Sequence, residues 1–180
     1  DVERSRGLGD VYKRQSLETY KQILPAALQI LNKAKLHFEE TGTDLEDIVQ
    51  ARLYEDMAPF SFQVFSIVHH SVGALNALKS GEFGPPNMPE NLDFAALHSL
   101  LEEAVNDLKN FTADEVDACS EQEVLFKMGS IEWPFSSESF ILSFSLPNFY
   151  FHVTTMYDML RMRGVSVGKL DFIGKMQLKN

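Results

Sequence analysis

The stretch LPNFYFHVTTMYDMLR, residues 146–161, decides the fold, because its apolar and aromatic residues recur with the spacing of a helix. Phe149, His152 and Met156 follow one another at intervals of three and four residues, so a helix places them on one face. A buried imidazole needs a hydrogen-bond partner, which an apolar face does not supply. The stretch therefore predicts a packed helix and makes the role of His152 the main question.

The residues around this stretch predict where the helix begins and ends. Ser136 or Ser137 can cap its amino end with Glu138 in the first turn, and Gly164 can end it. Pro147 lies inside the pattern and should bend the helix mid-way, because proline removes a backbone hydrogen bond.

Three more long helices are expected upstream, over about residues 20–41, 59–79 and 92–111. Each shows apolar residues at three- and four-residue steps. Pro25 should kink the first helix, and a short helix capped by Asp44 should follow it. Four long helices in one chain predict an all-α fold, a four-helix bundle.

Two connections complete the expected topology. Residues 80–91 hold three prolines and two glycines, so they form no helix and suit a long crossover between the second and third helices. Residues 124–135, VLFKMGSIEWPF, contain two short β-prone runs around a Gly-Ser pair. This pattern predicts a small β-hairpin before the fourth helix.

The chain divides into three parts. Residues 7–15, GLGDVYKRQ, match the translation of a common sequencing adaptor, so we expect residues 1–15 to be foreign to the fold. Residues 16–174 then form a single domain of ordinary size, and residues 175–180 form a C-terminal tail.

Composition narrows the classes of function. The net charge of −10 disfavours nucleic acid and anionic lipid as partners. No apolar run approaches the roughly 20 residues of a membrane helix, so no membrane association is expected. Cys119 is the single cysteine, which excludes an internal disulfide and a cysteine-based zinc site. A cytoplasmic protein fits these features.

Residues 51–64, ARLYEDMAPFSFQV, and residues 146–174, LPNFYFHVTTMYDMLRMRGVSVGKLDFIG, carry a family resemblance. Together they resemble an uncharacterised domain-of-unknown-function branch of the DinB/YfiT-like metalloenzyme superfamily. The resemblance implies a helical bundle. It also implies a site of three metal-binding histidines, one from the second helix and a His-x-x-x-His pair from the last, as in the thiol-dependent transferases of the superfamily.

This chain departs from that histidine pattern. Four residues after His152 stands Met156, and four residues before it stands Asn148. A thioether is a poor ligand for a divalent zinc or nickel ion. His69 and His70 on the second helix are weak candidates for further ligands, and at most one of them can face the core. We therefore expect no tightly held cofactor, although the resemblance leaves a divalent metal open.

His152 is the leading candidate for a catalytic residue. We expect Asp56, just before the second long helix, to be its partner and to form an acid/base pair with it. Two alternatives stay open: Asp56 caps the helix that follows, and His152 is a core histidine satisfied by another group.

Three functions follow from these features. The first is an uncharacterised DinB-like protein that binds a small molecule in a bundle pocket near His152, with acid/base catalysis that needs no complete metal triad. The second is a non-catalytic helical interaction module, active as a homodimer. The third is a metal- and thiol-dependent transferase. A cavity that reaches His152 would favour the first over the second.

Overall fold

The structure, a computed structural model, describes residues 2–119 and 121–179, with side chains from residue 15 onward. Its first helix, α1 (Val2–Thr41), runs without interruption through residues 2–15. The expectation that residues 1–15 pack poorly concerns side chains that lie almost entirely outside the described part.

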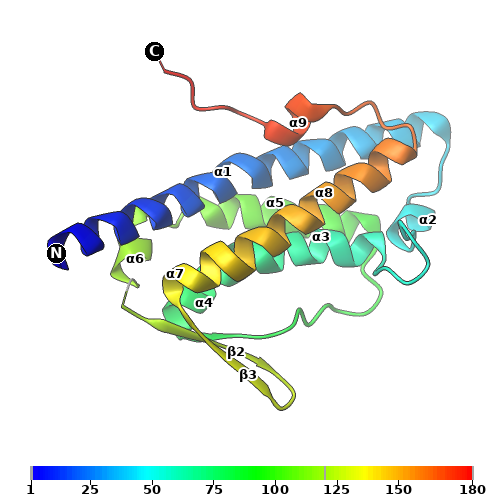
Figure 1. The fold of residues 1–180 in the computed structure, drawn as a ribbon. Coiled ribbons are helices and arrows are strands. Elements are labelled where there is room, and N and C mark those ends of the chain that lie inside the picture. The colour runs from blue at the N-terminus through cyan, green and yellow to red at the C-terminus, as the bar shows by residue number, and fades with distance from the viewer. Residues whose placement is uncertain (1, 120, 180) are drawn as a thin grey trace.

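Long helical segments lie side by side and form the body of the mostly helical molecule (Figure 1). One is α1, and another is α5 (Phe94–Leu108). Two more are composite. One of these runs through α3 (Phe60–Val68), η1 (His69–Gly73) and α4 (Ala74–Ser80), and the other through α7 (Ser137–Ser139), η2 (Phe140–Ser145) and α8 (Leu146–Met162). α3 packs against α5 and α8, and α1 also packs against both.

The core forms where the apolar faces of these segments meet. Phe149 and Met156, on the face predicted from the sequence, are fully buried. Tyr20 on α1 is also fully buried, and its ring meets Phe149 edge-to-face at a centroid distance of 5.1 Å. The Tyr20 hydroxyl lies 2.8 Å from Ser145 Oγ, so a buried polar group is satisfied inside the core.

Short polar residues begin several of the helices, as predicted. Asp44 caps α2 (Leu45–Val49) by accepting a hydrogen bond from the backbone N–H of Glu46. Ser136 caps α7 in the same way through the N–H of Ser139. Some short helices were not predicted, among them α6 (Ala113–Ala118), which begins with a capping box at Thr112.

The predicted hairpin is present, and a third strand joins it. β2 (Glu123–Met128) pairs antiparallel with β3 (Ile131–Ser136), with Phe126 opposite Trp133. The two-residue strand β1 (Glu82–Phe83) pairs parallel with β2, which gives the order β1-β2-β3. β1 opens the connection between α4 and α5, which runs back along the length of the molecule (Figure 1).

In the described residues, two π-helical turns interrupt segments whose spacing predicted α-helix. η1 contains His69 and His70, and η2 ends directly before α8, in whose first turn Pro147 lies. The turns face each other, because Ser145 Oγ donates a hydrogen bond to the backbone oxygen of His70 over 2.8 Å. Such turns insert one extra residue into a helix and often occur at functional sites.

The C-terminal segment folds back onto the helices. The helix α9 (Lys169–Ile173) packs on α1, and the Phe172 ring meets Tyr157 at 6.0 Å. Gln22 on α1 donates a hydrogen bond to the backbone oxygen of Ile173, and Lys33 forms an ion pair with Asp171. Among the described helices, none is long and apolar enough to cross a membrane.

Candidate functional site

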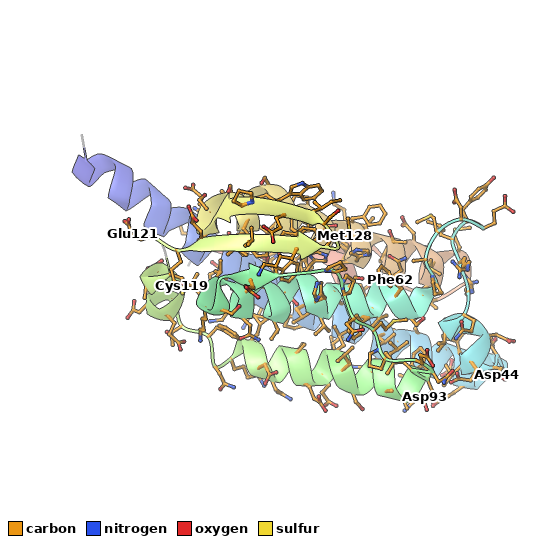
Figure 2. All side chains as sticks on the ribbon, turned by 90° about the horizontal axis from the view of Figure 1, so that it is seen from below. Asp44, Phe62, Asp93, Cys119, Glu121 and Met128 are labelled. Atoms are coloured by element: carbon orange, nitrogen blue, oxygen red, sulfur yellow. The ribbon has the colours of Figure 1, made fainter. Side chains whose placement is uncertain are left out.

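The predicted residue His152 borders a cavity of about 270 Å³ between the helices and the small sheet. α3 and η1 supply one wall, and η2 and α8 supply another. The sheet and the residues after β1 cover it. Figure 2 shows Phe62 on α3 and Met128 at the end of β2, and both side chains line this cavity.

The lining of this cavity is mainly aromatic. Four phenylalanines from different elements, two prolines and a methionine supply the apolar surface, and no lining residue carries a formal charge. The apolar residues are Phe62, Phe83, Pro85, Pro86, Phe126, Met128 and Phe144. The polar side chains are only Ser66, His70, Asn148 and His152. A few polar groups within a mostly apolar cavity are typical of a small-molecule site.

The ring of His152 is held from one side by Gln63 on α3. The side-chain nitrogen of Gln63 donates to the backbone oxygen of Ala58 over 3.0 Å, so its Oε1 accepts from His152 Nδ1 over 2.8 Å. This chain of bonds places the proton of the neutral imidazole on Nδ1. His152 Nε2 therefore keeps its lone pair and is an acceptor.

His70 lies beside His152 in the same cavity. The two rings are almost parallel, with an interplanar angle of 15° and centroids 5.9 Å apart. Within the described residues, His70 Nδ1 and the Ser66 hydroxyl are buried without a hydrogen-bond partner. Unpaired buried polar atoms are rare in folded proteins, and both of these belong to residues that line the cavity.

Both cavity histidines are held in the neutral form. Burial, followed by the charges of His69 and His152, lowers the pKa of His70 to about 3. Burial, followed by the charge of His69, lowers the pKa of His152 to about 4. At neutral pH the cavity therefore contains two uncharged imidazoles and no imidazolium.

His69 has a structural role and does not line the cavity. Its Nε2 donates to the backbone oxygen of Gly84 over 2.9 Å, and its ring stacks on Phe83 at 4.3 Å. It therefore anchors the segment after β1 over the helices. The prediction that at most one of the adjacent histidines faces inward agrees with this arrangement, because His70 is buried and His69 is half-buried.

The structure corrects the expected partner of His152. Asp56 is exposed in the segment before α3, whereas Gln63 occupies the hydrogen-bonding position at Nδ1. Asp56 does not cap the helix either, because Pro59 is the N-cap of α3 and makes no side-chain cap bond. A neutral amide satisfies the imidazole without the cost of burying a carboxylate. The signal for Gln63 was its position as the single long polar side chain within the apolar run FSFQVFSIV.

A family of protein domains matches nearly the whole chain. The family described as "Domain of unknown function (DUF1993)" matches residues 12–173. The chain belongs to the DUF1993 family. A search of curated proteins finds no match for it.

A solved structure shares the fold of this DUF1993 domain. It is a crystal structure at 1.83 Å resolution of a DinB family member protein from Shewanella denitrificans. The TM-score is 0.76 at 20% sequence identity, and the alignment covers 97% of this chain and 98% of the other. The mostly helical DUF1993 domain is therefore DinB-like in fold.

The cavity of the DUF1993 domain does not fit the three-histidine metal site that the superfamily resemblance implies. No group of three His, Cys, Asp or Glu side chains in the described part of the chain could hold a metal ion. Asn148 stands four residues before His152, at a position where a His-x-x-x-His pair would have its other histidine. Its amide nitrogen donates to the backbone oxygen of Phe144 over 2.7 Å. Met156 is buried in the core. Two imidazoles and an amide are a weak donor set for zinc or nickel.

A larger groove of about 900 Å³ lies elsewhere, between α1 and the C-terminal segment. Its polar lining residues, which include Glu18, Lys21 and Gln29, are exposed or half-buried, and no histidine or cysteine contributes to it. The smaller cavity is the better candidate site, because its mostly apolar wall holds a few polar side chains, two of them histidines.

Proposed function

We propose that this DinB-like four-helix bundle binds a small uncharged molecule in the cavity bordered by His70 and His152. The observation that carries the proposal is the aromatic cavity that reaches the ring of His152, whose other side is fixed by Gln63. A preformed pocket of this kind, with few but fixed polar groups, is the usual form of a ligand site.

The neutral state of the histidines limits the chemistry we propose. General acid catalysis needs a protonated group, and a pKa of about 4 leaves His152 unprotonated at neutral pH. Acid/base chemistry at this site would therefore start with proton transfer to Nε2, assisted by a ligand that stabilises the imidazolium. The primary role we assign to His152 is that of a hydrogen-bond acceptor for the ligand.

A fragment screen by ligand-observed NMR tests the proposal. We expect small aromatic fragments to bind the wild-type protein and to lose binding in Asn148→Phe, which places a large side chain at a half-buried position of the cavity wall. The matched control is Gln29→Phe in the larger groove on α1. Fragments that survive Asn148→Phe but are lost in Gln29→Phe would place the ligand site in that groove and contradict the proposal.

A second candidate function, the dimeric interaction module, rests on one surface feature. The hairpin carries three exposed apolar side chains, Met128, Ile131 and Trp133. They lie next to one another on one face of the paired strands. Exposed apolar clusters often mark protein interfaces. If this interface exists, light scattering will show a dimer that Trp133→Lys converts to a monomer.

A further inference from the structure

We propose that the ligand of the cavity is a neutral aromatic molecule of one or two rings that donates one hydrogen bond, from N–H or O–H, to His152 Nε2. This inference rests on the proposed function and adds the chemical class of the ligand. Four features of the cavity carry it: size, wall chemistry, absence of charge and direction of the available hydrogen bond.

The size of the cavity sets the number of rings. An apolar cavity of about 150 Å³ in a protein core is large enough for benzene. The cavity beside His152, at about 270 Å³, is less than twice that volume and is partly open to solvent. It therefore accepts one ring or two fused rings, and a tripeptide-sized thiol such as those used by thiol transferases would extend far outside it.

The walls favour an aromatic ligand over an aliphatic one. The phenylalanines at the cavity already contact each other as tilted and edge-to-face pairs, for example Phe83 with Phe144 at 6.2 Å and Phe126 with Phe144 at 5.1 Å. The rings of His70 and Phe62 also border the space. An inserted ring extends this network, and each aromatic pair adds about 0.5–1.5 kcal/mol beyond the burial of its area.

The charges around the cavity exclude ionic ligands. No Lys or Arg lines it, and the net charge of the chain is −10, so a carboxylate or phosphate would meet no cation there. A quaternary ammonium could contact the aromatic rings, but it would leave the lone pair of His152 Nε2 without a donor. A neutral ligand avoids both costs.

The direction of the free hydrogen bond makes the ligand a donor. The Gln63 amide nitrogen donates to the backbone oxygen of Ala58, so Gln63 Oε1 accepts the hydrogen bond from His152 Nδ1. This chain of hydrogen bonds leaves the lone pair of the neutral His152 ring on Nε2. No hydrogen bond to Nε2 is present among the described residues, and His152 lines the cavity. A ligand N–H or O–H satisfies this acceptor, whereas a ligand carbonyl would oppose it.

A matched pair of probes tests the inference. Indole and indene have nearly the same shape, but only indole has an N–H. Isothermal titration calorimetry should show that the wild-type protein prefers indole by about fivefold or more, the worth of one hydrogen bond. In His152→Phe, which keeps an aromatic ring but removes the acceptor, this preference should disappear. The comparison within the wild-type protein remains decisive even if the variant does not fold.

The other outcomes separate this inference from the proposed function. Equal binding of indole and indene to the wild-type protein would overturn the hydrogen-bond assignment and leave small-molecule binding intact. If tetramethylammonium binds and neither indole nor indene does, the assignment of the ligand as a neutral aromatic molecule is wrong. If no fragment binds in the Asn148-dependent manner described above, the proposed function fails and this inference fails with it.

Discussion

Replacement of Gln63 by leucine should destabilise the protein, and most of this loss should depend on the presence of His152. Gln63 is 2% exposed, and both ends of its amide are bonded, to Ala58 and to His152. Leucine has a similar volume, so the packing loss is small. The main cost is an unpaired buried donor on His152, for which about 1–3 kcal/mol of unfolding free energy is expected.

The coupling between the two residues gives the sharper result. His152→Phe alone leaves Gln63 Oε1 unpaired and should cost a similar amount. In the double variant Gln63→Leu, His152→Phe neither unpaired group of this pair remains, so the total loss should fall short of the sum by about 1 kcal/mol or more. Urea denaturation followed by circular dichroism measures all four proteins.

One result and one control decide this prediction. Losses that add within about 0.5 kcal/mol would refute the hydrogen bond between Gln63 and His152 as an energetic unit. Asp56→Ala is the matched control: because Asp56 is exposed, its replacement should change stability by less than about 0.5 kcal/mol and show no coupling to His152. Coupling to Asp56 would restore the partner expected from the sequence.

Three further predictions concern pH, the C-terminal segment and metal. The pKa values of His70 and His152 are lowered to about 3 and about 4, so the unfolded state binds protons that the folded state does not. Above about pH 6.5 both histidines are neutral in the folded and the unfolded state, so they do not lower the free energy of unfolding. As the pH drops from 6.5 towards 4, each histidine should lower this free energy by about 1 kcal/mol per pH unit. His152→Phe should flatten this slope in urea titrations, and an unchanged slope would contradict the burial of a neutral imidazole. Gly174→Ala should cost about 2 kcal/mol, because Gly174 has φ +66° and an added Cβ would lie 2.8 Å from Ala26 Cβ. Gly42→Ala, with φ +67° but no atom within 4 Å, should cost only about 1 kcal/mol, and equal losses would show that contact with Ala26 is irrelevant. Protein purified without added metal should carry well under one equivalent of zinc, nickel or iron by elemental analysis, and close to one equivalent that His152→Ala abolishes would show that the donor set does hold a metal.

The three- and four-residue spacing of apolar residues predicted the helices and their buried faces. Phe149 and Met156 are in the core as their spacing requires, and Asp44 caps its helix because a short polar side chain can reach the first free N–H. The hairpin followed from two β-prone runs around a Gly-Ser turn. These features depend on neighbours in the sequence, which is why the sequence alone predicted them.

The features that the sequence did not predict depend on contacts between distant segments. The π-turn at His70 is stabilised by Ser145, 75 residues away, and no local pattern marks the extra residue. The pairing of His152 with Gln63 spans 89 residues. Asp56 was expected in that place because it lies just before the second long helix, where the mouth of the bundle was expected, but its segment leaves it in solvent. His152 and His70 were identified as candidates from the sequence. The aromatic walls around them were not predicted, because they form only where residues from four elements meet.

Nitrogen-15 NMR of the histidine side chains at pH 7 tests the central claim most directly, with His152 assigned through the His152→Phe variant. We predict a neutral ring with its proton on Nδ1 and an unprotonated Nε2 whose resonance moves when a cavity ligand is added. A protonated Nε2, or an imidazolium at this pH, would contradict the account, because the cavity would then offer a donor or a charge where we propose an acceptor.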